Sequence, residues 1–391
     1  MTYTNDFPLF QNRPELIYLD NAATSQKPQV VLDAISSYYT TSNSNIHRGP
    51  HFMAEEATKL YNSSRSTVSK FINAKHSHEI IFTRNATESI NLIAKTFGTQ
   101  LQSGDVVCIS RLEHHSNIVP WLQLKEDIGI DVIFFDLPSD SINIPNNCKL
   151  LSITGMSNVT GYLPNLKALI KQAHDIGVPV LLDACQLAVH SPIDVQDLDV
   201  DFLAFSGHKL YGPTGIGVLY AKEEILNSIP PFLGGGDMIQ EVNEDSFKPA
   251  GLPDKFEAGT PNIAGAVGLM AAIKYVESIG WDIIQSTEKE LTSYALTKLR
   301  ELDYIQIIGH ESDTNYGSVI SFTMDTVHPH DVAEGLSSKG ICMRAGHHCC
   351  QIFMDHNNLS ATVRMSLAIF NTKEEIDKTI NTLKEIYIYF N

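Results

Sequence analysis

The chain has 391 residues, 43% of them hydrophobic and 19% charged, and a formal net charge of −17. This composition is typical of a globular protein of two or three domains and excludes wholesale disorder and a fibrous repeat. The acidic balance argues against nucleic acid as a partner. No apolar run approaches the ~20 residues of a membrane span, and the start lacks signal-peptide features. The six irregularly spaced cysteines are expected to be reduced, as in a cytoplasmic protein.

Short apolar runs alternate with helical patterns through the middle of the chain. The candidate strands are Glu79–Phe82, Asp105–Ser110, Val132–Phe135, Leu150–Thr154, Pro179–Asp183, Phe202–Ser206 and Gly215–Tyr220. Between them, segments such as Thr87–Thr96 and Leu166–His174 carry apolar residues at helical spacing. This alternation predicts an α/β fold with a mostly parallel sheet between helices. Because several strands end in polar residues, we expect a ligand site at their carboxyl ends.

The pattern changes after Pro261. A small-residue helix is expected first, and shorter strands and amphipathic helices follow it, at Ile263–Ser278, Ile283–Leu302, Ile305–Gly309, Ser318–Met324, His330–Lys339 and from Lys373 onward. This order predicts a smaller C-terminal α+β domain. We place the boundary near residue 275, which gives a large domain of residues 16–275 and a small domain of residues 276–391, on which residues 1–15 pack.

A lysine and an aspartate suggest a cofactor. Lys209 lies in a glycine-flanked turn after an apolar strand, where burial favours the neutral amine that a Schiff base requires. An isolated turn lysine is usually solvated, and Asp183 alone is as often a helix cap. Pyridoxal phosphate, however, needs both a lysine and an acid that keeps its ring nitrogen protonated. With Gln186 close to Asp183, the pair predicts a pyridoxal phosphate site.

The phosphate of such a cofactor needs hydrogen-bond donors. Asn85–Glu88 follows a strand and opens a helix, so its N–H groups and the Thr87 hydroxyl are candidates, although the segment also fits an ordinary N-cap. Ser206 and His208 flank the lysine turn and are further candidates. His114 follows another strand and is a candidate to lie flat on the pyridine ring, although a lone histidine is more often structural.

A cysteine near the end of the chain has the setting of a reactive thiol. Arg344–Cys350 contains an arginine and two histidines, which supply the electropositive environment that Cys349 would need. No second CxxC or HxxxH pair lies at ligand spacing, so no metal site is expected. Burial in a structural role fits Cys108 better than Cys349. Arg364 lies in an apolar stretch, and a buried arginine requires an anion such as a substrate carboxylate.

These residues together resemble the cysteine desulfurases of the class V aminotransferase family, within fold-type I of the pyridoxal phosphate enzymes, and most closely the SufS branch (group II). The resemblance runs from Tyr18 to the C-terminal helix. Its most specific motifs are Ile46–Gly49, Glu113–Trp121, Ser157–Val159, Ser206–Tyr220, Phe256–Pro261 and Arg344–Cys349. It implies a homodimer that converts L-cysteine to L-alanine and passes sulfur, as a persulfide, to an acceptor protein for iron–sulfur cluster assembly.

The resemblance also implies roles for individual residues. Those implied for the cofactor are Lys209, Asp183, Gln186, His114, Ala86, Thr87, Ser206, His208 and, from the other subunit, Thr260. Those implied for the substrate are Asn158, Arg364, Arg344 and Ala23, with Cys349 as sulfur acceptor and Lys209 and His114 as further catalytic groups. Two positions depart from the family pattern. Cys185 occupies a site that is usually free of sulfur, and Cys350 follows the acceptor where the family usually has alanine.

The acceptor protein is expected to be one of two types in this family, SufE-like or zinc-containing SufU-like. His330 resembles the histidine that takes over a zinc-ligand position in the SufU-partnered branch, which favours a SufU-like acceptor. The other interpretation is an exposed histidine near a helix N-cap. A selenocysteine lyase or another class V enzyme is the alternative function. A non-catalytic scaffold would be expected to lack Lys209 or Asp183, and both are present.

Overall fold

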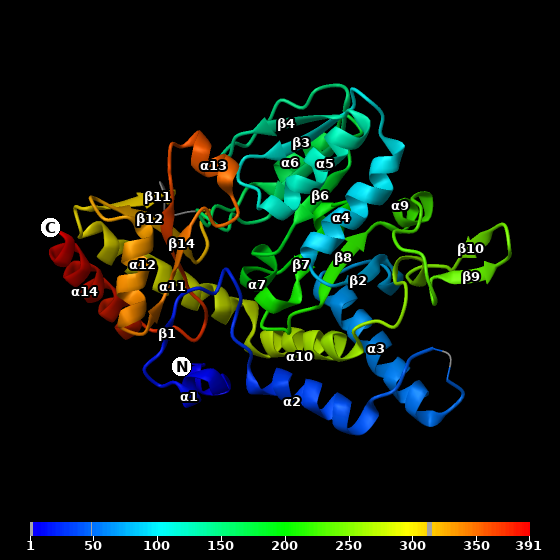
Figure 1. The fold of residues 1–391 in the computed structure, drawn as a ribbon, viewed down its shortest axis with the longest axis horizontal. Helices are drawn as coiled ribbons and strands as arrows, with labels where there is room; N and C mark the ends of the chain where they lie inside the picture. Colours follow the sequence, from blue (N-terminus) through cyan, green and yellow to red (C-terminus); the bar gives the residue numbers. More distant parts are fainter. Residues whose placement is uncertain (1–2, 48, 311–314) are drawn as a thin grey trace.

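The computed structural model describes residues 3–47, 49–310 and 315–391, so Arg48 of the Ile46–Gly49 motif lies outside the described residues. A seven-stranded sheet in the order β2-β8-β7-β6-β5-β3-β4 forms its centre (Figure 1). Its strands are β2 (Ile80–Thr83), β3 (Val106–Ser110), β4 (Asp131–Phe135), β5 (Cys148–Thr154), β6 (Val180–Asp183), β7 (Phe202–Ser206) and β8 (Gly217–Ala221). β8 runs antiparallel to both neighbours, and the other adjacent pairs are parallel. The predicted α/β fold is confirmed, and the predicted strands agree within two residues.

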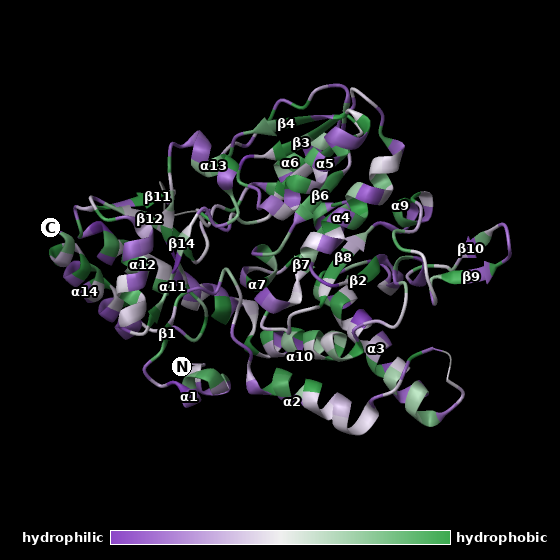
Figure 2. Cartoon of the chain, viewed as in Figure 1, coloured by the Kyte–Doolittle hydropathy of each residue, from purple (hydrophilic) through white to green (hydrophobic). Residues whose placement is uncertain are grey.

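Helices cover both faces of this sheet (Figure 1). Alternate residues of each strand point into two separate cores. One core includes α3 (Phe52–Phe71), α6 (Leu166–His174) and α10 (Ile263–Ile279), and the other includes α4 (Ala86–Thr96) and α5 (Val119–Ile128). A strand buried on both faces has a continuous apolar sequence, which explains why these runs were recognisable. In Figure 2 the strands of this sheet are mostly green, the colour of hydrophobic residues.

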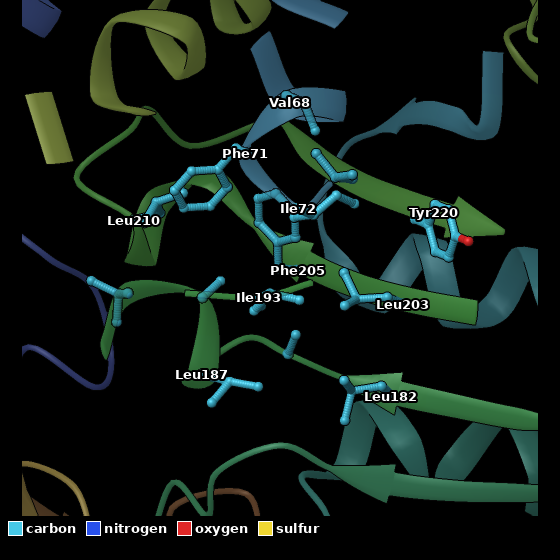
Figure 3. Close-up of a cluster of buried hydrophobic side chains, with 14 of the residues drawn as sticks. Val68, Phe71, Ile72, Leu182, Leu187, Ile193, Leu203, Phe205, Leu210 and Tyr220 are labelled. Atoms are coloured by element: carbon cyan, nitrogen blue, oxygen red, sulfur yellow. The ribbon is translucent and has the colours of Figure 1, made fainter. Parts of the chain in front are cut away.

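One part of the first core lies between α3 and the middle of the sheet (Figure 3). Phe71 and Ile72, at the end of α3, belong to one cluster with Leu203 and Phe205 of β7 and Tyr220 of β8. Phe205 and Leu203 are fully buried. Each such side chain contributes about 1.5–3 kcal/mol relative to an exposed position. This packing holds β7, and therefore the turn that follows it, in a fixed place.

The C-terminal part contains a four-stranded antiparallel sheet with the order β11-β12-β15-β14. Its elements are β11 (Ile305–Ile308), β12 (Val319–Met324), β14 (Arg344–Gly346), β15 (Thr362–Ser366), α11 (Trp281–Arg300), α12 (Pro329–Ser338) and α14 (Lys373–Phe390). β1 (Ile17–Tyr18) pairs in parallel with β13 (Ile341–Cys342), so Ile17 and Leu19 belong to this second core. The predicted α+β segment is confirmed, while the division at residue 275 stays a prediction.

The remaining elements are short or peripheral. They are α1 (Pro8–Asn12), α2 (Gln29–Ser37), α7 (Leu187–His190), α8 (Val195–Leu198), α9 (Glu223–Ser228), α13 (Gln351–His356) and the hairpin of β9 (Ile239–Val242) and β10 (Phe247–Pro249). Near the start of the chain, Thr4 donates a hydrogen bond to the carbonyl oxygen of Phe370, and Asp6 accepts one from the Tyr275 hydroxyl. In the described ranges no single helix is long and apolar enough to cross a membrane. The consecutive helices α10 and α11 reach that length and apolar composition only when taken together, and the chain bends by 79° between them.

The arrangement of strands brings several polar segments to one edge of the central sheet. The carboxyl ends of β2, β3, β5, β6 and β7 meet there, and because β8 is antiparallel its first residue, Gly217, lies at the same edge. A Cβ atom on Gly217 would come within 2.5 Å of the Asn85 backbone, so this close approach requires glycine. Ligands of open α/β sheets bind at such an edge.

Candidate active site

A cavity of about 300 Å³ lies at this edge. Thirteen predicted site residues line it: Ala23, Ala86, Thr87, His114, Asn158, Asp183, Gln186, Ser206, His208, Lys209, Arg344, Cys349 and Arg364. Two predicted residues are not among those lining it, Thr260 on the loop before α10 and His330 on α12. The cavity therefore combines the carboxyl ends of the central strands with residues of the C-terminal sheet.

Lys209 and Asp183 come from neighbouring strands. Asp183 is the last residue of β6 and pairs with Ala204 of β7, and Lys209 ends the turn that follows β7. The Asp183 carboxylate is buried and accepts a hydrogen bond from the N–H of Cys185 at 3.0 Å. The turn is anchored through the carbonyl oxygen of His208, which accepts from the Ser25 hydroxyl at 3.0 Å and from Lys27 Nζ at 2.9 Å. Burial lowers the pKa of Lys27 to about 8.

The N-terminus of α4 forms a polar corner of the cavity. Asn85 caps the helix by accepting the Glu88 N–H at 2.9 Å, and the Ala86 N–H donates to the Ser206 hydroxyl at 2.9 Å. The Thr87 hydroxyl lies 2.8 Å from that of Ser116. These donors coincide with the positive end of the helix dipole, which suits a phosphate group.

Two histidines of the cavity are neutral. Burial, followed by the charge of Lys209, lowers the pKa of His114 and of His208 to about 4. His114 Nδ1 accepts the Ser116 N–H at 3.1 Å, so the ring proton resides on Nε2. A neutral imidazole with its proton on Nε2 can lie against an aromatic ring and still donate a proton.

Arg364 and Arg344 form the opposite wall and share one carboxylate. They pair directly across β15 and β14, and Asp20 accepts hydrogen bonds from Arg364 Nη2 at 3.0 Å and from Arg344 Nη2 at 2.9 Å. Arg364 also donates to the carbonyl oxygen of Asn158 at 3.0 Å, while its Nε has no partner among the described residues. The anion that a buried arginine requires is therefore partly internal. Sequence analysis missed this role of Asp20.

The two adjacent thiols differ sharply in environment. Cys349 is exposed, and it lies in a turn between β14 and α13 where His348 and Cys349 have φ values of 52° and 56°. Asn158 Nδ2 donates to the His348 carbonyl oxygen at 2.6 Å and so ties this turn to the cavity. Cys350 is buried, and burial raises the pKa of its thiol. Cys349 is therefore the accessible nucleophile of the two.

Comparison with known proteins agrees with this geometry. The profile of the aminotransferase class-V family matches residues 17–379. Probable cysteine desulfurases from Streptomyces coelicolor and Staphylococcus aureus are each 44% identical, over 98% and 99% of this chain and 96% of their own length. The cysteine desulfurase CsdA from Escherichia coli superposes with a TM-score of 0.91 at 37% identity, covering 100% of this chain and 98% of its own. One from Thermococcus onnurineus NA1 superposes with a TM-score of 0.92 at 38% identity, covering 98% and 96%.

This chain belongs to the cysteine desulfurases of the class V aminotransferase family. Pyridoxal phosphate is the cofactor of this desulfurase, and the residues present fit it. The corner at Ala86 and Ser206 suits a phosphate group, and the buried Asp183 carboxylate in the same cavity is the acid that would face the ring nitrogen. Gln186 has a buried Oε1 without a hydrogen-bond partner in the described chain, although its amide group donates to the Ala22 carbonyl oxygen at 2.9 Å. A bound molecule can satisfy that free oxygen.

A buried carboxyl group supports the His114 loop of the desulfurase, and sequence analysis did not single it out. Glu113 is fully buried and accepts hydrogen bonds from Asn117 Nδ2 and the Thr154 N–H, both at 2.7 Å, and from the Ser110 hydroxyl. Burial raises the pKa of Glu113 to about 8. The sequence signal is an acidic residue directly before the His114 position, but two of its partners, Ser110 and Thr154, lie on different strands.

Replacing Glu113 with glutamine is expected to change how stability depends on pH. The pKa is raised from an ordinary value of 4.5 to about 8, so the folded protein binds one more proton than the unfolded chain in this range. The contribution of this group therefore falls as pH rises. As pH rises from about 5 to about 8, denaturant unfolding should show the free energy of unfolding of the Glu113→Gln variant increasing relative to that of the wild type. A pH-independent difference between the two proteins would contradict the assignment.

Proposed function

We propose that this desulfurase converts L-cysteine to L-alanine with a persulfide on Cys349 and hands that sulfur to an acceptor protein for iron–sulfur cluster assembly. One observation carries the proposal. Among the six cysteines, all of them in described residues, Cys349 is the exposed one, and it lines the cavity that also contains Lys209 and Asp183. A thiol that accepts sulfur and later releases it to a partner protein must reach both the substrate and the surface.

The reaction can be followed through the residues of this chain. Arg364 and Arg344 bind the substrate carboxylate, to which Arg364 offers its free Nε, and the Lys209 amine removes the proton from the substrate Cα. Bound pyridoxal phosphate supplies the electron sink for that proton removal, with Asp183 keeping its ring nitrogen protonated. The Cys349 thiolate attacks the substrate sulfur, so an S–S bond forms while the Cβ–S bond breaks.

The remaining steps release alanine. The electron pair of the broken Cβ–S bond stays with Cβ, which takes up a proton from His114 Nε2, and the imidazole regains the proton that the Cys349 thiol released when it became a thiolate. Lys209 returns the proton to Cα. This assignment agrees with the neutral state of His114, whose pKa lies at about 4 and whose Nδ1 is occupied by the Ser116 N–H. Both protons therefore come from groups that line the cavity.

Thr260 is proposed to act in a neighbouring subunit. It lies outside the cavity of its own chain, in a groove with Tyr38 and Asn45. A homodimer in which this groove faces the partner's α4 would let the Thr260 hydroxyl reach the partner's phosphate corner. Glu257 supports the loop, because it forms a buried ion pair with Arg65 at 2.7 Å.

Replacing Cys349 with alanine tests the proposal. The wild type should release alanine and sulfide from L-cysteine in equal amounts in the presence of a thiol reductant, and Cys349→Ala should lose both products. Cys342→Ala is the matched control, because Cys342 is a half-buried thiol two residues before Arg344. Alanine formation that persists in Cys349→Ala would contradict a Cys349 persulfide and would point to Cys350, Cys185 or direct elimination.

The identity of the acceptor can be tested at His330. His330 is exposed in the first turn of α12, and its ring stacks on that of His328 at 5.4 Å. We propose that His330 takes over a zinc-ligand position of a SufU-like acceptor. His330→Ala is expected to abolish the stimulation of turnover by such a protein and to leave turnover without it unchanged. Unchanged stimulation would contradict the proposal, and His356→Ala controls for the loss of an exposed imidazole.

A further inference from the structure

The loop that carries His114 also holds the turn that carries Cys349. The next residue in the loop, His115, makes two hydrogen bonds to that turn. Its backbone N–H donates to the Cys349 carbonyl oxygen at 2.7 Å, and its Nε2 accepts the Gln351 N–H at 3.1 Å. The two bonds lie on either side of Cys350, so His115 is hydrogen-bonded to the backbone at Cys349 and again two residues later.

These two bonds matter because the backbone of the turn is strained, and they act on its C-terminal side, while Asn158 and Thr362 hold His348 on the other side. His348 and Cys349 both have left-handed φ values, 52° and 56°, which residues with a side chain rarely adopt. Such a conformation persists only where surrounding contacts enforce it. The helix that follows, α13, has Cys350 at its N-cap without a side-chain hydrogen bond, so its first N–H, that of Gln351, has no cap from its own segment. The imidazole of His115 satisfies this donor.

We propose that His115 is a positioning residue for the sulfur transfer, in which its imidazole fixes the Cys349 turn relative to the loop that carries His114. This inference rests on the proposed role of Cys349 as sulfur acceptor. The order of the two histidines is then functional, because His114 lines the cavity while His115 points to the turn. One loop thereby sets the place of both the cavity imidazole and the attacking thiol.

The ionisation state of His115 suits this task. Nε2 must be unprotonated to accept the Gln351 N–H, which leaves the proton on Nδ1. Burial, followed by the neighbouring imidazole of His347, lowers the pKa of His115, and the ring of His114 lies 6.3 Å away. The acceptor is therefore available at neutral pH.

Two substitutions separate positioning from general damage. In His115→Leu the backbone bond to Cys349 remains and the acceptor for Gln351 is lost. In His115→Gln the side-chain carbonyl oxygen can replace Nε2 as acceptor. His356→Leu, an exposed histidine on the same α13 helix, is the matched control. Each holoenzyme is mixed with L-cysteine in a stopped-flow instrument. The absorbance change of the cofactor reports substrate binding, and mass spectrometry of quenched samples reports persulfide on Cys349 in the first turnover.

The expected result is a split between the two readouts. Persulfide formation in His115→Leu should slow by about 10- to 100-fold, since a small misplacement of a reacting group costs up to that much, while the absorbance change stays within about twofold. His115→Gln should recover most of the rate. Equal rates in His115→Leu and wild type, equal slowing of both readouts, or a His115→Gln as slow as His115→Leu would each overturn the inference. Persulfide that forms elsewhere in Cys349→Ala would instead refute the proposed acceptor itself.

Discussion

Lys209→Ala is expected to lower alanine formation from L-cysteine by about 10⁴-fold, because the loss of a general base alone costs about 10²–10⁴-fold. The variant would also lack the amine that we propose attaches the cofactor covalently. The substitution should leave the fold intact, since the anchors of the turn are made by the His208 carbonyl oxygen and not by the Lys209 side chain. Turnover of the purified variant, measured beside its melting temperature, checks both statements.

A second buried amine makes the control informative. Lys27 donates a hydrogen bond to the same turn. Burial lowers the pKa of Lys27 to about 8, so its amine is partly neutral near pH 8. Borohydride reduction of the wild type followed by peptide mapping should place the cofactor on Lys209, and the same treatment of Lys209→Ala should leave no peptide labelled. A label on Lys27 in the wild type would contradict the assignment of Lys209.

Arg364→Met is expected to raise the KM for L-cysteine by about 100-fold, because a hydrogen bond to a charged group contributes about 1.5–3 kcal/mol. Methionine fills much of the buried volume but cannot bind a carboxylate. Binding of cysteamine, which lacks the carboxylate, should change little between variant and wild type, as measured by its effect on the cofactor absorbance. An equal loss for both compounds would mean that Arg364 supports the cavity wall and does not bind the substrate.

The strands of the central sheet could be predicted because of where they lie. β5, β6 and β7 are covered by helices on both faces, so most of their residues are apolar, and β6 and β7 are apolar up to their last residue. The direction of β8 could not be predicted in the same way, since an apolar run has the same sequence pattern in either direction. Its antiparallel pairing with β7 depends on the turn between them and on the close approach of Gly217 to Asn85.

Some residues of the site could also be predicted from the sequence and others could not. Lys209 and Asp183 were recognisable because Asp183 ends an apolar strand and Lys209 lies in the turn after another, so their local sequence already shows where they lie. Asp20 and His115 were not, because their roles depend on partners far away in the sequence. Asp20 meets Arg364 at a separation of 344 residues, and His115 meets Gln351 at a separation of 236. A pattern confined to neighbouring residues contains no information on such contacts.

The pairing of β1 with β13 has a consequence for the order in which the molecule is assembled during synthesis. Ile17 emerges from the ribosome early, but its partner Ile341 and the bridge from Asp20 to Ser366 become available only when the chain is almost complete. Contacts that close so long a loop form late, while the central sheet can fold as soon as β8 is present. Lys209 and Asp183 are therefore expected to reach their places in the nascent chain well before the cavity wall that contains Arg364 is formed.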